Sequence, residues 1–282
     1  MTFDATSTAK PRLVTPPGTC DTHLHFYDPK FSTVPGTATP PDGANVDAYR
    51  KLQKRLGLTR AVIVQPSAYG KDNRCTLEGI AALGLSNTRG IAVVDTSVTN
   101  TELARLTQAG IRGVRYLMLA DAPPLPWDML DRLTQRVQDV GWHVQLQMDG
   151  RRFAEREAQI LRWPGTIVID HNGKFLEPVA VDDPAFHSLL RLIDSGRVWV
   201  KLSAPYETSK VGPPRYDDVG RLAKALAKAA PERMLWASNW PHPSVKHTPD
   251  DAALLDLLLD WAPDPATRQR ILVNNPAELY GF

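Results

Sequence analysis

The sequence predicts a single (β/α)₈ barrel, the TIM-barrel fold of the α/β class, and three observations lead to it. The 282-residue chain contains eight short runs that are mostly apolar and rich in β-branched residues, as expected of strands buried on both faces. Amphipathic stretches lie between several of these runs, and a helix between successive strands implies parallel pairing. Eight such units without a separating linker favour a closed barrel over an open sheet.

The predicted elements follow one another along the barrel, which we assign to residues 19–282. Residues 1–18 are rich in Thr, Ser, Pro and Ala, and we interpret them as a flexible N-terminal leader. The expected strands are residues 20–25, 60–67, 90–96, 111–117, 143–149, 166–172, 198–203 and 234–239. Helices are expected at residues 46–56, 127–140, 186–195 and 219–230, among others.

Two long loops follow the first and seventh predicted strands, at residues 28–45 and 204–216. Both leave the carboxyl ends of strands, where the active sites of barrels lie. Their length is typical of lids. For residues 28–45 a disordered surface loop is the alternative interpretation.

Composition excludes several classes of partner. The net charge is +2 and the basic residues are scattered, so we expect no nucleic-acid partner. No apolar stretch is long enough to span a membrane, and the N-terminus lacks the pattern of a secretory signal. Cys20 and Cys75 are therefore expected to be free thiols in a reducing compartment. We expect a cytoplasmic enzyme with a small-molecule substrate, and the sequence allows a homo-oligomer.

Polar residues collect where the predicted strands end. His23 and His25 stand two apart, so both side chains lie on the same face of the first strand. Polar groups on apolar strands are costly unless they are paired or functional. A histidine pair that faces further polar groups across a barrel mouth predicts an active site. The other candidates at or just after strand ends are Ser67, Arg115, Gln145, Gln147, His171, Lys174, Lys201, Tyr206, Asn239 and His242.

The order of these motifs resembles the amidohydrolase superfamily. Its hallmarks are matched by Asp21-Thr22-His23-Leu24-His25, by His171 at the end of the sixth strand and by a polar residue at the end of the eighth. The closing segment, residues 275–282, is similar to the tail of the amidohydrolase-2 branch, which contains lactonases and a lactone isomerase. The resemblance spans residues 20–282 and implies a barrel enzyme that acts on lactones bearing carboxylates.

The chain departs from the metal-dependent members of that superfamily. They add a carboxylated Lys or a Glu on the fourth strand, or a His on the fifth, and an Asp on the eighth. Here the fourth strand carries Arg115, the fifth carries Gln145 and Gln147, and the eighth ends in Asn239. His143 begins the fifth strand and is expected at the opposite end of the barrel. A neutral amide is a poor Zn²⁺ ligand, so we expect no metal and no other cofactor, which disfavours a decarboxylase of the metal-dependent type.

Asn239 also bears on the reaction. Hydrolytic relatives use a carboxylate at this position to activate water, and an amide cannot accept that proton. A hydroxyl group of the substrate is an easier nucleophile, since effective molarities for such internal attack reach about 10⁵–10⁸ M. The sequence therefore favours a metal-independent lactone isomerase of the galactarolactone type, working by intramolecular acyl transfer. The alternatives are a lactone hydrolase with a different base, and a non-catalytic barrel that binds a sugar acid, which the histidines disfavour.

Roles can be assigned on this hypothesis. His171 is the first choice of base, with His23 or His25 second, while Asn239 donates to the oxyanion and His242 returns a proton. Arg115 and Lys174 are expected to bind substrate carboxylate, and the position of Lys174 is similar to a basic contact in the pyrone-dicarboxylate lactonase. The alternatives are a solvated loop lysine for Lys174, and a buried ion pair of Arg115 with Asp95 or Asp149. Lys201 is either a third cation or a partner of Asp170. The remaining expected substrate contacts are Ser67, Gln145, Gln147 and Tyr206.

Overall fold

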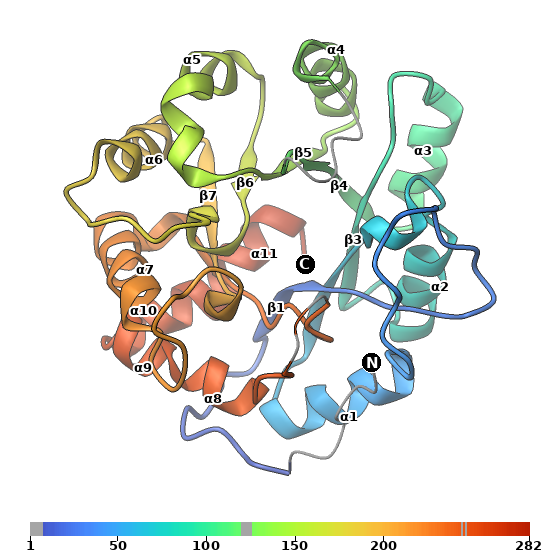
Figure 1. Ribbon diagram of the computed structural model, residues 1–282. Helices are drawn as coiled ribbons and strands as arrows, with labels where there is room; N and C mark the ends of the chain where they lie inside the picture. Colours follow the sequence, from blue (N-terminus) through green and yellow to red (C-terminus); the bar gives the residue numbers. More distant parts are fainter. Residues whose placement is uncertain (1–7, 120–125, 244, 246) are drawn as a thin grey trace.

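The computed structural model describes residues 8–119, 126–243, 245 and 247–282, and it confirms the barrel. Eight parallel strands pair in chain order, each with the next, and the helices form an outer ring around them (Figure 1). The strands are β1 Cys20–Leu24, β2 Arg60–Val64, β3 Thr88–Ala92, β4 Ile111–Leu117, β5 His143–Gln147, β6 Ile167–Ile169, β7 Val198–Leu202 and β8 Met234–Trp236.

The outer helices follow from local sequence signals. Asn45 caps α1 by accepting a hydrogen bond from the backbone N–H of Ala48, and Gly57 ends the helix with φ 72°. Asp183 caps α6, which begins with Pro184. The helices are α1 Val46–Leu56, α2 Arg74–Leu83, α3 Asn100–Gln108, α4 Trp127–Gln138, α5 Phe153–Arg162, α6 Pro184–Asp194, α7 Asp217–Ala229, α8 Asp251–Asp256, α9 Leu258–Trp261, α10 Pro265–Gln269 and α11 Asn275–Tyr280.

A buried carboxylate links the first and last strands and so helps to close the barrel. Asp21 accepts hydrogen bonds from the backbone N–H of Ser238 at 2.9 Å and from its hydroxyl at 2.5 Å. Tyr49 donates to the same carboxylate at 3.1 Å. Backbone bonds complete the seam, from Asn239 N–H to the carbonyl of His23 at 2.9 Å. Because Asp21 is buried, its pKa is raised to about 6.

The structure corrects several predicted boundaries. The strand predicted at residues 166–172 ends at Ile169, because His171 and Asn172 leave the sheet with φ of 52° and 56°. The strand predicted at residues 234–239 ends at Trp236. The third strand begins at Thr88 rather than at residue 90, since Thr88 pairs with Ala61 although it is polar. The predicted β4 and α1 match the observed elements.

The structure also places His143, the two cysteines and the end of the N-terminal segment. His143 begins β5 and packs against Tyr280, with 5.3 Å between ring centroids, so it lies at the end of the barrel away from the site. Cys20 and Cys75 are buried free thiols. In the segment assigned to the leader, Leu13 is buried and Arg12 donates to Asp256. Within the described residues, no helix is both long and apolar enough to cross a bilayer.

Candidate active site

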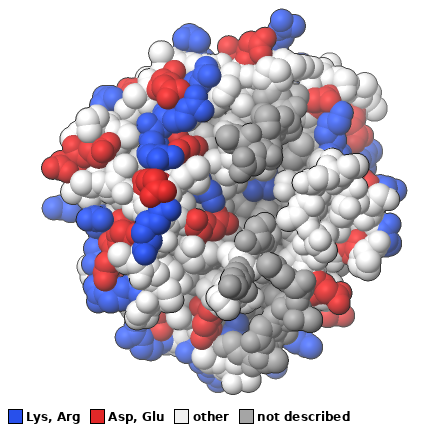
Figure 2. Space-filling model, viewed as in Figure 1, with Lys and Arg blue, Asp and Glu red and all other residues white. Residues whose placement is uncertain are grey.

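The carboxyl ends of the strands surround a hollow in which basic atoms are visible (Figure 2). Backbone conformation is unusual here. His171, Lys174, Asn239 and His242 all have φ between 50° and 62°, a region that residues other than glycine rarely occupy. Such strain costs on the order of 1–3 kcal/mol per residue and clusters at functional sites. Four residues that the sequence had singled out thus share a strained backbone at this end of the barrel.

The two histidines of β1 and its extension form a fixed pair. Nε2 of His23 lies 3.2 Å from Nε2 of His25, and Nδ1 of His25 lies 2.7 Å from the carbonyl oxygen of Val64. The carbonyl can only accept, so His25 carries its proton on Nδ1. Nε2 of His25 is then an acceptor, so the hydrogen bond between the two Nε2 atoms requires that His23 carry its proton on Nε2. Nδ1 of His23 is left as an acceptor.

Three polar groups surround that acceptor. Gln145 and Lys201 both place a nitrogen 3.4 Å from Nδ1 of His23, and Oδ1 of Asp170 lies 3.3 Å from it. Gln145 also donates to Asp170 at 3.2 Å and accepts from Lys201 at 2.6 Å. Lys201 lies 3.6 Å from Asp170, which confirms the pairing considered as one alternative for Lys201. Gln145 and Lys201 are fully buried and bonded to one another, so they support His23 from within the barrel.

His171 differs from the other two histidines because one ring nitrogen is available. Its Nδ1 lies 2.9 Å from the hydroxyl of Ser203, whereas Nε2 has no hydrogen bond within the described part of the chain. The ring lies 4.8 Å from that of His23, centroid to centroid. If Ser203 donates to Nδ1, His171 carries its proton on Nε2. It can then donate an N–H to a substrate oxygen.

Burial controls the charge of this cluster. It lowers the pKa of His25 to about 3 and the pKa of His23 and His171 well below the usual value. It lowers the pKa of Lys201 to about 8, so this lysine is still mostly protonated at pH 7. The histidines are therefore neutral at pH 7 and weak proton acceptors, whereas Lys201 carries a positive charge.

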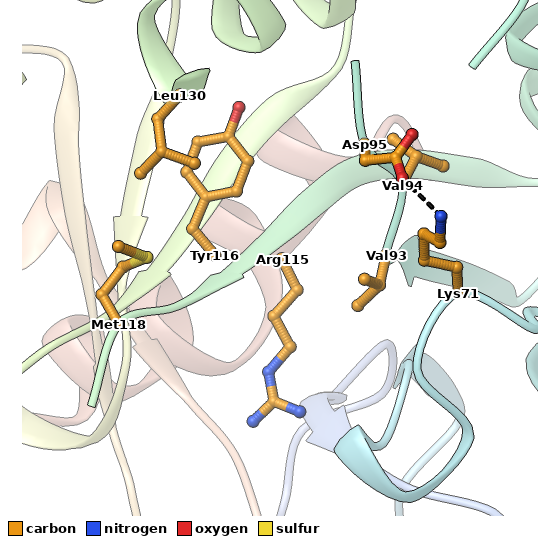
Figure 3. Close-up of a pocket in the computed structure, with 8 residues that line it drawn as sticks. All are labelled: Lys71, Val93, Val94, Asp95, Arg115, Tyr116, Met118 and Leu130. Carbon is orange, nitrogen blue, oxygen red and sulfur yellow. Dashed lines mark hydrogen bonds and ion pairs between the residues drawn. The ribbon is translucent and has the colours of Figure 1, made fainter. Parts of the chain in front are cut away.

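Arg115 is a buried cation that forms no ion pair with a carboxylate among the described residues. Its Nη1 donates to the carbonyl of Gln65 at 2.9 Å and its Nη2 to the side chain of Gln147 at 3.1 Å, while Nε is buried with no partner. Asp95 and Asp149, the expected alternatives for an ion pair, bind Lys71 and Arg151 instead. Figure 3 shows the guanidinium directed away from the Lys71–Asp95 pair, beside a pocket of about 190 Å³.

A carboxylate that the sequence analysis did not single out lies across the mouth. Glu207 ends a short 3₁₀ turn, Pro205–Glu207, that follows β7. One of its oxygens is paired with Lys174 and the other accepts from Asn239 Nδ2 at 3.0 Å. Lys174 is 6% exposed, so it is not a solvated loop lysine, and its charge is already balanced by Glu207. An acidic residue in a loop carries no strand-end signal, which is why the pattern did not reveal Glu207.

Asn239 begins a chain of hydrogen bonds at the end of β8. Besides bonding Glu207, its Nδ2 donates to the hydroxyl of Tyr206 at 2.8 Å. That hydroxyl lies 2.8 Å from Nδ1 of His242, whose Nε2 lies 3.0 Å from Asp251. Both amide hydrogens of Asn239 are thus directed to protein groups. The oxyanion role predicted for Asn239 would require one of them to be released.

The structure brings most of the predicted residues into three bonded groups. The first contains His23, His25, Gln145 and Lys201, the second joins Arg115 to Gln147, and the third contains Lys174, Tyr206, Asn239 and His242. Ser67 is exposed and belongs to none of these groups, so its contact with the substrate stays a prediction.

A divalent metal does not fit these side chains as they stand. Within the described residues, His23, Asp170 and His171 offer ligand atoms within 4.8 Å of one another. However, N–H groups of Lys201 and Gln145 already point at Nδ1 of His23, and the Lys201 ammonium lies beside Asp170. An ammonium in this position repels a divalent ion.

Comparison with known proteins gives the family. The amidohydrolase family model matches residues 20–282. D-galactarolactone isomerase of Agrobacterium fabrum is 36% identical over 96% of this chain and 93% of its own length. The 2-pyrone-4,6-dicarboxylate hydrolase of Comamonas testosteroni is 33% identical over the same shares. A crystal structure from Agrobacterium tumefaciens superposes with a TM-score of 0.90 at 35% identity, covering 96% of this chain and 98% of that one. The chain therefore belongs to the amidohydrolase family.

Proposed function

We propose that this protein is an enzyme acting on lactones, and specifically an isomerase that interconverts lactones of a sugar dicarboxylic acid without a metal. The relatives that match nearly the whole chain are a galactarolactone isomerase and hydrolases of lactones, which supports the general class. The finer assignment depends on the charges in the site.

The unpaired charge of Arg115 carries this assignment. Among the described residues of the site, Lys174 is balanced by Glu207 and Lys201 by Asp170, which leaves Arg115 as the cation without a carboxylate. A lactone formed within a sugar dicarboxylic acid keeps one free carboxylate, whereas a pyrone dicarboxylate carries two. One buried cation in need of a partner matches a substrate with one negative charge. The Nε–H of Arg115, which has no partner, can form one arm of a bidentate contact to that carboxylate.

We assign the proton transfer to Glu207. Burial lowers the pKa of His171 and so makes it a weak proton acceptor, whereas Glu207 is a carboxylate held in place by Lys174 and Asn239. In this scheme Glu207 takes the proton from a substrate hydroxyl, which attacks the lactone carbonyl of the same molecule. A new C–O bond forms, the old one breaks, and the proton passes to the departing alkoxide.

His171 is then the donor to the oxyanion. If Ser203 donates to Nδ1, the neutral imidazole carries its proton on Nε2 and can donate a hydrogen bond from there to the carbonyl oxygen. The scheme changes both roles that the sequence alone suggested. His171 donates to the oxyanion instead of acting as the base, and Asn239 orients Glu207 instead of donating to the oxyanion.

Lactone hydrolysis is the second candidate, and Glu207 is the observation that favours it. The prediction against hydrolysis rested on the absence of a base at position 239, and a carboxylate oxygen lies 3.0 Å from the Asn239 amide. Glu207 could deprotonate a water molecule as readily as a hydroxyl group of the substrate.

The product separates the two reactions. We would follow five- and six-membered lactones of a six-carbon sugar dicarboxylic acid by NMR in H₂¹⁸O. The isomerase proposal expects the other ring as the first product, with no ¹⁸O incorporated. Open-chain acid as the main first product, carrying one ¹⁸O, would establish the hydrolase instead. Turnover of neither ring form would remove both assignments for this substrate class.

A further inference from the structure

Lys201 is a fully buried charged residue of the site. It lies on β7 with no exposed surface. Its Nζ is 2.6 Å from Oε1 of Gln145, 3.4 Å from Nδ1 of His23 and 3.6 Å from Oδ1 of Asp170. Three polar atoms thus surround one ammonium group, a hydrogen-bonded amide oxygen, an imidazole nitrogen and a carboxylate oxygen.

The same surroundings are those a divalent ion would use. His23, Asp170 and His171 offer imidazole and carboxylate atoms within 4.8 Å of one another, and these are the ligand types that Zn²⁺ prefers. Oδ1 of Asp170 is buried and accepts no hydrogen bond from the described residues; it lies 3.3 Å from Nδ1 of His23 and 3.6 Å from the Lys201 ammonium. The positive charge that balances this carboxylate is the ammonium of Lys201.

We propose that Lys201 is a resident cation that takes the place of a divalent metal in this barrel. The ammonium balances the charge of Asp170 and donates to Nδ1 of His23, which keeps the proton of His23 on Nε2. It also excludes metal, because a divalent ion bound to His23 and Asp170 would lie within a few ångströms of a positive charge. The chain therefore contains a latent metal site that becomes functional when the ammonium is removed.

Metal binding tests this inference directly, independently of any lactone activity. Wild-type protein and Lys201→Met would be stripped with a chelator, checked for folding by circular dichroism and titrated with Zn²⁺ by calorimetry. Co²⁺ would report coordination geometry through its visible absorption. We expect no stoichiometric binding by wild type and one equivalent bound by Lys201→Met. The zinc dissociation constant should fall by at least about 100-fold, because repulsion between an ammonium and a divalent ion a few ångströms away is several RT even at an effective dielectric constant of about 20.

Two further variants test whether the bound ion uses Asp170 and whether its binding requires the loss of Lys201 in particular. Lys201→Met combined with Asp170→Asn removes a ligand and should lose the bound ion. Lys174→Met is the matched control, since it also removes a buried lysine paired with a carboxylate but leaves Lys201 in place. It should remain unable to bind Zn²⁺ stoichiometrically.

The outcomes are decisive even if one variant misfolds. Lys201→Gln keeps a donor for Gln145 and replaces Lys201→Met if the latter does not fold. One equivalent of Zn²⁺ bound by wild type and lost in Asp170→Asn would overturn the proposal, since the ammonium would then not exclude metal. Failure of every folded neutral variant at position 201 to bind an ion would overturn it as well. A hydrolase result in the lactone assay would leave this inference untouched.

Discussion

Replacing Arg115 with methionine should selectively weaken capture of the substrate. The variant removes the positive charge and the donor fork while keeping much of the side-chain volume. A hydrogen bond to a charged group is worth about 1.5–3 kcal/mol, so losing one lowers kcat/KM by roughly 10–150-fold, and losing two lowers it further. The loss should fall mainly on KM, because the carboxylate is distant from the reacting carbonyl and is bound equally in the ground and transition states.

The structure also predicts that this variant folds. Removing Arg115 leaves the carbonyl of Gln65 and the side chain of Gln147 without a donor, at a cost of about 1–3 kcal/mol each. It also removes a buried charge that has no carboxylate partner in the described part of the chain, and this removal is stabilising. These effects oppose one another, so the free energy of unfolding should change little.

Steady-state kinetics with matched variants provides the assay. Arg112 lies at the start of the same strand, where it donates to the carbonyls of Thr107 and Ile111, so Arg112→Met controls for loss of an arginine from β4. Arg115→Lys keeps the positive charge but loses the paired donors of the guanidinium. Its kcat/KM should lie between that of wild type and that of Arg115→Met. Lys174→Met should cost less in KM than Arg115→Met, since Glu207 already balances Lys174. An unchanged kcat/KM in folded Arg115→Met would refute the reasoning.

Three further predictions address the proton acceptor, the strand-eight amide and the buried histidines. Glu207→Gln should lower kcat by about 10²–10⁴-fold with little change in KM, as expected for loss of a general base, and a kcat near that of wild type would exclude this role. Asn239→Asp would place a second carboxylate beside Glu207, where a 3.0 Å hydrogen bond now lies, so one of the two should be protonated near neutral pH. Water should then begin to compete with the substrate hydroxyl, and open-chain acid should appear among the products. The kcat of this variant should therefore change with pH near neutrality, and a pH profile and product identical to those of wild type would contradict this. Stability should fall as the pH drops below 6.5, because the pKa of His25 and of His143 is lowered to about 3 and only the unfolded chain then binds those protons. At pH 5 each of these histidines should cost about 2 kcal/mol, offset by about 1 kcal/mol from Asp21, whose raised pKa acts in the opposite direction. Urea denaturation between pH 7.5 and 5 measures this, and a constant free energy of unfolding would show that these histidines become protonated in the folded state.

The strands of the barrel could be predicted because burial on both faces leaves a strong pattern in the sequence. Residues 111–117 form β4 as predicted, and residues 46–56 form α1 between an Asn cap and a Gly cap. Errors fall where a strand gives way to the site. At the end of β6 the polar residues His171 and Asn172 were included in the strand, but their side chains are required at the mouth and the backbone turns out of the sheet.

The histidines and Arg115 could be found from the sequence because they interrupt apolar strands. Glu207 could not, since an acidic residue in a polar loop looks like any solvated surface residue. Only the fold brings it within 3.0 Å of Asn239, thirty-two positions further along the chain. The partners of Arg115 were equally hidden, because its two hydrogen bonds go to the backbone of Gln65, just after β2, and to the side chain of Gln147 on β5.

The ion pairs of the site bear on two proposals, the charge of the substrate and the exclusion of a metal ion. Asp170 and Glu207 are each opposed by a lysine, Lys201 and Lys174, so neither carboxylate needs an external cation. Arg115 alone among the described cations of the site still needs an anion, and its fixed backbone and amide contacts hold it ready for one. A substrate with a single carboxylate restores balance, whereas a dianion would bury a second negative charge without a partner, which costs several kcal/mol unless it is compensated. We therefore propose that the same two lysines, Lys201 and Lys174, both take the place of a metal and restrict the site to a substrate with one negative charge.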